Sequence, residues 1–122
     1  RQHNTGQYAP VLGVFMKQKN EGSPLTVTGE GKQKRDFVHV SDVVSANVLA
    51  FENKTAPSEV FNVGSGKSYA IKEIANMISD NLIYIPHRDG EVFATEAIIN
   101  KIKSAMGWEP KVKLKEWIEE KL

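Results

Sequence analysis

The sequence predicts a mixed α/β domain, α+β-like in its arrangement, with short strands and about five helices. Three observations support this fold class. Short β-favouring runs recur along the chain, segments with helical spacing of apolar residues stand between them, and no internal repeat is present. The expected order is helix, strand, strand, helix, strand, helix, strand, helix, helix. A length of 122 residues suits one domain with a single core.

The composition excludes several classes of function. Hydrophobic residues make up 40% and charged residues 25%, which is ordinary for a soluble globular protein. The net charge of +1 argues against a nucleic-acid partner. The absence of cysteine rules out disulfides, thiolate metal sites and cysteine nucleophiles. Because neither a signal peptide nor an apolar run of membrane length is present, we expect a cytoplasmic protein with no membrane partner.

The first predicted elements are a helix and a short strand. Pro10 suits a first helical position, apolar residues follow it, and Gly22 provides a stop. Residues 25–28 alternate in β-favouring side chains, and the glycines of residues 29–31 form a turn. The predicted strand therefore ends at a tight turn.

A predicted strand then leads into a helix. Residues 37–40 alternate in apolar character, and the spacing of Val44, Val48 and Phe51 is helical. We expect Ser41 to cap this helix, Asp42 to add negative charge to its first turn, and the helix to end near Asn53. A junction of this kind can hold an anionic ligand, although most such junctions only connect two elements.

The second half of the chain continues the alternation. Residues 59–63 suggest a strand, which a glycine-containing loop joins to a helix over residues 71–80. The continuous apolar run at residues 82–85 predicts a buried strand that Pro86 ends.

Two short helices are expected at the end of the chain. Asn100 can cap the first, and Gly107 occupies its stop position with Pro110 beyond it. Trp108 is expected to pack against this stop. The apolar spacing of residues 114–118 gives the final amphipathic helix.

The chain carries no catalytic constellation of its own. A Walker loop ending at Gly66 requires glycine five places earlier, where Phe61 stands. The two Gly-x-Gly pairs both lack the third glycine of a dinucleotide-binding fingerprint. The three histidines are far apart in sequence, and their spacing does not predict a metal site.

Two arginines and an amide are instead candidates for binding an anion. Arg35 stands beside a predicted strand, Asn62 beside a glycine-rich turn, and Arg88 in a charged loop. An arginine donates two parallel charge-assisted hydrogen bonds to a phosphate, so this set could grip a diphosphate. Each residue alone is more often a surface residue, so the interpretation depends on their convergence in space.

Several ordered motifs resemble the extended short-chain dehydrogenase/reductases that act on nucleotide sugars. They are Gly29-x-Gly31-x-Gln33-x-Arg35-Asp36-Phe37-Val38-His39-Val40-x-Asp42-Val43-Val44, then Phe61-Asn62-Val63-Gly64-Ser65-Gly66, Arg88-x-Gly90-Glu91, and Lys101-x-Lys103 leading to Gly107-Trp108-Glu109-Pro110, with Arg1-Gln2 and Gly22-x-Pro24-Leu25 also matching. The resemblance spans essentially the whole chain. It identifies residues 1–122 as similar to the C-terminal, nucleotide-sugar-binding part of an NAD-dependent epimerase or dehydratase.

The resemblance implies roles for six residues. By position, Arg35 and Arg88 bind the nucleotide diphosphate of a UDP- or dTDP-sugar and Asn62 lies near the same site. The residues that line the base are Leu25, Thr26 and Val27.

The family's catalytic and cofactor-binding half is expected upstream of this chain. Four places after Tyr8, Tyr69 and Tyr84, a family Tyr-x-x-x-Lys pair would need lysine, and each position holds another residue. The implied NAD or NADP would therefore be bound by the parent enzyme and not by these residues. The face that such a half normally covers is expected to expose an apolar patch and to drive self-association.

A stand-alone module that binds or assembles without catalysis is the alternative to a substrate-binding fragment. Three departures from the family pattern bear on the match. Ala70 replaces a Ser/Thr cap, Ile98 replaces an Asp, and the segment between Asp80 and Pro86 is short, which affects the placement of the Arg88 loop.

Overall fold

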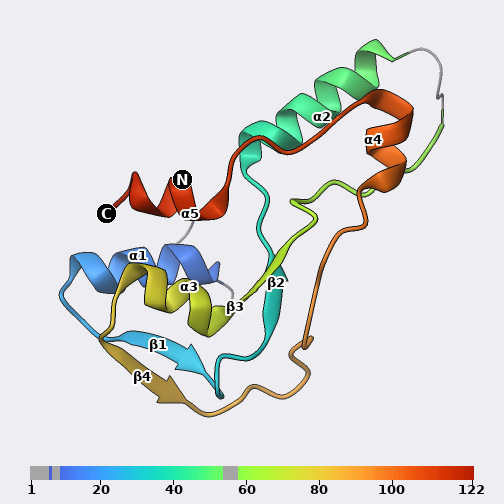
Figure 1. Cartoon of the computed structure of the whole chain (residues 1–122). Coiled ribbons are helices and arrows are strands. Elements are labelled where there is room, and N and C mark those ends of the chain that lie inside the picture. Colours follow the sequence, from blue (N-terminus) through green and yellow to red (C-terminus); the bar gives the residue numbers. More distant parts are fainter. Residues whose placement is uncertain (1–5, 7–8, 54–57) are drawn as a thin grey trace. The chain divides into compact units, whose positions relative to one another are not determined.

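The fold consists of two compact units that each combine segments from distant parts of the chain (Figure 1). The computed structural model describes Gly6 and residues 9–53 and 58–122, so the Arg1-Gln2 match lies outside the described residues. The first unit contains Arg1–Gln33 and Ala70–Phe93, and the second contains Lys34–Tyr69 and Ala94–Leu122. The described residues form five helices and four strands in the predicted order, which confirms the mixed α/β class.

The first unit packs two helices on a two-stranded parallel sheet. Helices α1 (Val11–Asn20) and α3 (Ile71–Ile78) cover one face of strands β1 (Leu25–Thr28) and β4 (Leu82–Ile85), as Figure 1 shows. Leu25 pairs with Leu82 in this register. The core of the unit consists of Leu12, Phe15, Leu25, Val27, Ile71, Ile74, Ala75 and Ile78. Burying a side chain of this size stabilises the fold by about 1.5–3 kcal/mol, so this unit has a substantial core.

The second unit is built around Trp108. Its elements are β2 (Lys34–Asp36), α2 (Val40–Glu52), α4 (Asn100–Met106), α5 (Leu114–Glu119) and most of β3 (Ser68–Ala70, paired with β2), because the unit boundary falls after Tyr69. Trp108 is buried with Ala46 of α2 and Ile102 of α4. Gly107 has φ of 66° and ends α4 in the left-handed conformation, which confirms its predicted stop position and the packing of Trp108 behind it.

The strand predicted at residues 37–40 is wrong, because β2 lies earlier and α2 already begins at Val40. The residue that caps α2 is His39, not Ser41. The ring Nδ1 of His39 accepts a hydrogen bond from the backbone N–H of Ser41 at 3.2 Å. An imidazole thus takes the place of the expected hydroxyl, and the helix starts before the predicted cap.

The prediction of a strand at residues 59–63 is also wrong. The structure gives this segment no strand pairing, and the third strand is β3 instead. β-favouring residues need a neighbouring strand to complete their ladder, and Val60 is 81% exposed. The strand at residues 82–85 is confirmed, but its expected burial is not, since Ile83 and Tyr84 are exposed. A two-stranded sheet covered on one face leaves the other face to solvent.

The capping of the later helices differs in detail from expectation. Asn100 is the first residue of α4 and does not cap it, because Ile99 occupies the cap position. At α3 the Glu73 carboxylate accepts a hydrogen bond from the backbone N–H of Ala70 at 2.7 Å. Half of a capping box therefore forms, although the alanine side chain supplies no hydrogen-bond acceptor.

Among the described helices, none has the length and apolar character that crossing a bilayer requires.

Candidate functional site

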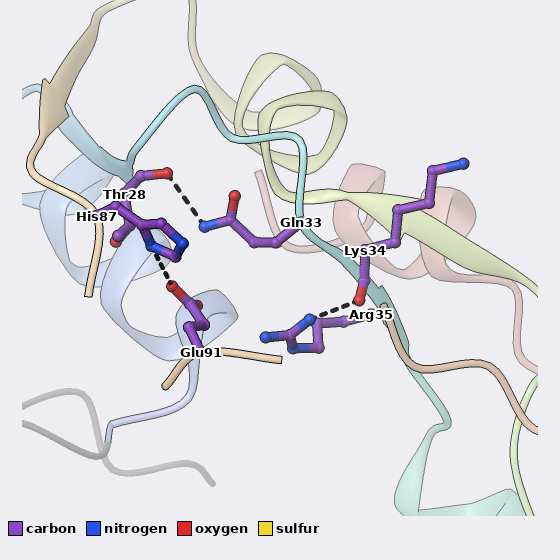
Figure 2. A network of polar contacts seen from close by, with 6 residues as sticks. All are labelled: Thr28, Gln33, Lys34, Arg35, His87 and Glu91. Carbon is purple, nitrogen blue, oxygen red and sulfur yellow. Dashed lines mark hydrogen bonds and ion pairs between the residues drawn. The ribbon is translucent and has the colours of Figure 1, made fainter. Parts of the chain in front are cut away.

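Arg35 lies at the centre of β2, in the second unit. Its strand is fixed by pairing with β3 and by a parallel bridge between Lys34 and Ala94. The half-buried side chain folds back so that Nη1 donates to the carbonyl of Lys34 at 2.7 Å (Figure 2). A guanidinium has five N–H donors in a fixed fork geometry.

The adjacent Asp36 joins β2 to two other segments of the second unit. Its Oδ1 accepts hydrogen bonds from the backbone N–H of Ser65 at 2.8 Å and from the hydroxyl of Ser65 at 2.6 Å. Its Oδ2 accepts from the backbone N–H groups of Gly66 and Ala97, each at 3.0 Å. One carboxylate therefore holds the glycine-rich loop and the chain at Ala97 against the strand that carries Arg35.

Asn62 lies in the same unit as Arg35, on the segment that enters this loop. Its side chain is exposed. Two residues further on, a Cβ built on Gly64 would lie 2.4 Å from the Cβ of Ala97 and 2.9 Å from Oδ2 of Asp36. Only glycine allows the chain to pass so close to the carboxylate. The loop after Asn62 is thus fixed tightly to β2.

Arg88 lies in the first unit, in the loop after β4. Its side chain is exposed, and its carbonyl accepts a hydrogen bond from the backbone N–H of Glu91 at 3.4 Å. The Glu91 carboxylate also lies 3.7 Å from Nδ1 of His87 (Figure 2). Because Arg35 and Arg88 belong to different units, their convergence on one ligand stays a prediction.

The three residues assigned to the base lie on β1 with different exposure. Leu25 and Val27 are fully buried in the core of the first unit. Thr26 is half-buried, and its hydroxyl accepts a hydrogen bond from the side-chain amide of Gln18 at 2.9 Å. The side chains of Leu25 and Val27 therefore shape the sheet, which leaves Thr26 and the backbone of β1 as the groups that can face a ligand.

The turn after β1 is held from within the first unit. The side-chain amide of Gln33 donates to the carbonyl of Thr28 at 3.1 Å, as Figure 2 shows. Gly31 has φ of 69°, and a Cβ there would lie 2.7 Å from a methyl carbon of Val27. The Gly-x-Gly part of the motif thus serves a tight turn against β1.

Asp42 is a buried residue that the sequence interpretation treated only as a helix-start charge. It is 3% exposed, and its carboxylate accepts hydrogen bonds from the backbone N–H groups of Lys111 at 3.1 Å and Val112 at 3.0 Å. Its own carbonyl accepts from the indole Nε1 of Trp108 at 3.2 Å. A signal for this role was present, since Asp42 lies four residues before the buried Ala46 and so shares its face of α2.

Two other carboxylates of the second unit accept hydrogen bonds that favour their charged form. Hydrogen bonds from the hydroxyl and the backbone N–H of Ser68 lower the pKa of Glu96. A hydrogen bond from the ammonium of Lys101 lowers the pKa of Glu59. Charged carboxylates that already accept hydrogen bonds are poor general acids. The described residues also contain no group of His, Asp and Glu side chains arranged to hold a metal ion.

An open depression of about 660 Å³ lies in the first unit. Its lining includes Glu30, Lys32, Lys72 and Tyr84. The ammonium of Lys72 lies 5.7 Å from the centre of the Tyr84 ring, and Lys32 is paired with Glu30. The six residues of the predicted site are not among its lining residues.

Comparison with known proteins decides the family. Residues 2–64 match the NAD dependent epimerase/dehydratase family. The chain belongs to this family. The resemblance inferred from the ordered motifs is confirmed at this level, including the part of the signature that contains Arg35, Asp36 and Asn62.

Solved structures and sequence relatives agree with this assignment. The crystal structure of UDP-glucose 4-epimerase with UDP-glucose from Thermotoga maritima is 33% identical, with a TM-score of 0.88 over 98% of this chain and 40% of that one. UDP-glucuronic acid 4-epimerase from Bacillus cereus, in complex with UDP-glucuronic acid and NAD, is 30% identical, with a TM-score of 0.82 over 90% and 37%. UDP-N-acetyl-alpha-D-glucosaminuronate decarboxylase of Bacillus cytotoxicus is 30% identical over 94% of this chain and 39% of its own length.

The chain thus spans about two fifths of the length of the relatives that it matches. Its residues do not fit an NAD site of the family type, because the sequence contains neither the glycine loop nor the Tyr-x-x-x-Lys pair. The NAD of the Bacillus cereus complex is therefore not assigned to residues of this chain.

Proposed function

We propose that this chain binds the nucleotide diphosphate of an NDP-sugar, and that the oxidation and reduction of the sugar are carried out by an NAD(P)-binding part of the whole protein. The observation that supports the proposal most strongly is the clamped pair of segments in the second unit. There Asp36 fixes the loop that follows Asn62 against the strand that carries Arg35.

The chemistry of this arrangement suits a diphosphate. A guanidinium donates parallel charge-assisted hydrogen bonds to phosphate oxygens, and an exposed amide NH₂ adds a neutral donor. A ligand held in this way is bound through charge and geometry, with no proton transfer required of the protein. The proposal also assigns Arg88 to the same diphosphate, and Thr26 with the backbone of β1 to the base.

The solved relatives make UDP-sugars the first ligands to test. UDP-glucose is bound by the Thermotoga maritima structure and UDP-glucuronic acid by the Bacillus cereus structure. A dTDP-sugar is the second candidate, because it offers the same diphosphate with a different pyrimidine. For the whole protein we propose epimerisation or dehydration of the sugar, with hydride transfer through NAD(P).

Isothermal titration calorimetry with UDP, UDP-glucose and dTDP-glucose tests the binding proposal. Arg35→Ala should weaken binding of each diphosphate by about 1.5–3 kcal/mol, the range for hydrogen bonds to charged groups, or about 10- to 140-fold in Kd. Binding of uridine, which has no phosphate, should change far less.

Lys115→Ala is the matched control for this experiment. Lys115 is an exposed cation in the same unit, and its ammonium lies 3.9 Å from Glu119 on α5. Its removal lowers the net charge as Arg35→Ala does but should leave the Kd of UDP unchanged. Equal losses of affinity for the two variants would show a general charge effect and would remove Arg35 from the site.

A stand-alone assembly module is the alternative, and one observation favours it. Four apolar side chains follow one another at helical spacing on α2. Their exposed fractions are 68% for Val40, 54% for Val44, 50% for Val48 and 91% for Phe51. We call these four residues the α2 apolar face. Such a face is typical of a surface that contacts another protein part. Self-association without any heat on titration with nucleotides would support the module over the substrate-binding function.

A further inference from the structure

We propose that the outer edge of strand β4 is an interaction surface, and that it pairs with the same edge of a second copy of this chain. The two β4 strands run antiparallel in this pairing and join the two-stranded sheets of both copies into one continuous sheet. The inference concerns the first unit alone, and it does not depend on the ligand proposed above.

The outer edge of β4 presents backbone hydrogen-bonding groups. Within the part of the chain that the structure describes, β4 pairs with β1 alone, and Figure 1 shows it at the outer side of this sheet. The carbonyl of Ile85 faces β1, where it accepts a hydrogen bond from the backbone N–H of Gly29 at 2.8 Å. Backbone groups of successive strand residues point alternately to the two sides of a strand. The N–H and C=O groups of Leu82 and Tyr84 therefore point away from β1.

The opposite edge of the same sheet is closed by side chains. The backbone N–H of Thr26 on β1 donates to the side-chain carbonyl of Gln18 at 3.1 Å. The carbonyl of Thr28 accepts from the side-chain amide of Gln33, also at 3.1 Å. Natural proteins protect edge strands with such covers, with charges or with proline, and Leu82–Ile85 contains neither a charge nor a proline. The contrast between the two edges indicates that β4 is the one that pairs.

The outward groups of β4 are complementary to themselves. Two-fold antiparallel pairing places Leu82 of each copy opposite Tyr84 of the other, and each of these pairs exchanges both of its N–H···O=C bonds. Ile83 then lies opposite Ile83 of the second copy as a non-hydrogen-bonded pair, with Cα atoms about 4.5 Å apart. A second copy of the chain thus satisfies this edge in a single defined register.

The side chains and flanking charges fit the same arrangement. Ile83 is 46% exposed and Tyr84 is 51% exposed, so pairing removes apolar surface from water. Asp80 precedes the strand and Arg88 follows it, and both are exposed. Antiparallel pairing brings the acidic end of one β4 to the basic end of the other, whereas parallel pairing would place like charges together. The charge pattern therefore favours the two-fold orientation.

Disulfide cross-linking tests the register, because the chain contains no cysteine. Ile83→Cys introduces a single thiol at the centre of the pairing, where a Cα separation of about 4.5 Å lies within the disulfide range of about 4.4–6.8 Å. With oxidised glutathione as oxidant, this variant should form covalent dimers at least about tenfold faster than Lys19→Cys, because a held pair of thiols reacts at a high effective concentration. Lys19 is an exposed residue of α1 in the same unit. Equal rates for the two variants would overturn the inference.

Two changes made in the Ile83→Cys chain identify the surface through which the copies meet. Adding Phe51→Lys, on the α2 apolar face, should leave the cross-linking rate unchanged; loss of cross-linking would show association through α2 and would overturn the pairing. Adding Tyr84→Pro removes an outward N–H without touching the ladder to β1, and it should slow cross-linking about tenfold. Tyr84→Ala keeps this N–H and should slow it less. Equal rates for the proline and alanine variants would count against backbone pairing.

Hydrogen exchange of the unsubstituted chain tests the pairing without any variant. The backbone N–H groups of Leu82 and Tyr84 should exchange more slowly as the chain concentration rises, because dimers form and protect them. The N–H of Ile83 points toward β1 and should exchange at the same rate at every concentration. Exchange at Leu82 and Tyr84 that does not depend on concentration would overturn the inference.

Discussion

Removal of the Asp42 carboxylate should be among the most damaging single changes in the second unit. The side chain is 3% exposed and accepts the backbone N–H groups of Lys111 and Val112 at 3.1 and 3.0 Å. Each hydrogen bond to a charged group contributes about 1.5–3 kcal/mol. Because the two bonds share one acceptor group and do not add fully, Asp42→Ala should lower the free energy of unfolding by about 3 kcal/mol.

Urea denaturation followed by tryptophan fluorescence measures this loss. Trp108 reports on the site directly, since its indole donates to the carbonyl of Asp42. With a denaturant slope of about 1.5 kcal/mol per M, a loss of about 3 kcal/mol moves the midpoint by about 2 M. Asp42→Asn keeps one acceptor and should lose about half as much. Asp80→Ala removes an exposed carboxylate and is the control, expected within about 0.5 kcal/mol of the unsubstituted chain. A midpoint for Asp42→Ala equal to that of Asp80→Ala would refute the reasoning.

Two further predictions concern acid stability and self-association. Hydrogen bonds from Ser68 lower the folded-state pKa of Glu96 below its ordinary value of 4.5. Its stabilising effect is therefore complete above pH 4.5 and is lost as the pH falls through the folded-state pKa. Glu96→Gln should weaken the dependence of the thermal midpoint on pH in this acid range, and an identical pH profile would contradict the assignment. Phe51, 91% exposed on the α2 apolar face, should drive self-association that sedimentation velocity detects. Phe51→Lys should shift the chain toward monomer while Lys115→Ala does not, and a monomeric unsubstituted chain at high concentration would argue against the patch.

Much of the fold can be predicted from the periodicity of apolar residues, and each error has its own local physical cause. Segments with apolar residues at helical spacing, such as those of α1 and α3, form helices because one face must be buried. Residues 59–63 favour a strand by composition but have no paired partner in this structure, so propensity alone does not form one. At the start of α2, an unusual histidine cap made the helix begin earlier than a hydroxyl cap would predict.

The candidate site shows a similar division. Arg35 and Asn62 could be named as candidates from the sequence, because their side chains carry hydrogen-bond donors that suit a phosphate and both lie in the family motif. The roles of Asp36 and Asp42 could not be read in the same way. Their partners are backbone N–H groups 29 to 70 positions away, and only the folded chain brings such groups together. An acidic residue inside a family signature can therefore serve to hold distant backbone segments together and need not bind a ligand.

Binding of a nucleotide diphosphate is the central claim, and side-chain NMR during a titration with UDP tests it most directly. The guanidinium signals of Arg35 and Arg88 and the amide NH₂ signals of Asn62 should shift together, with one common Kd. The guanidinium signals should not shift with uridine, which offers no phosphate. Shifts confined to one of the two arginines, or equal shifts with uridine, would contradict the account.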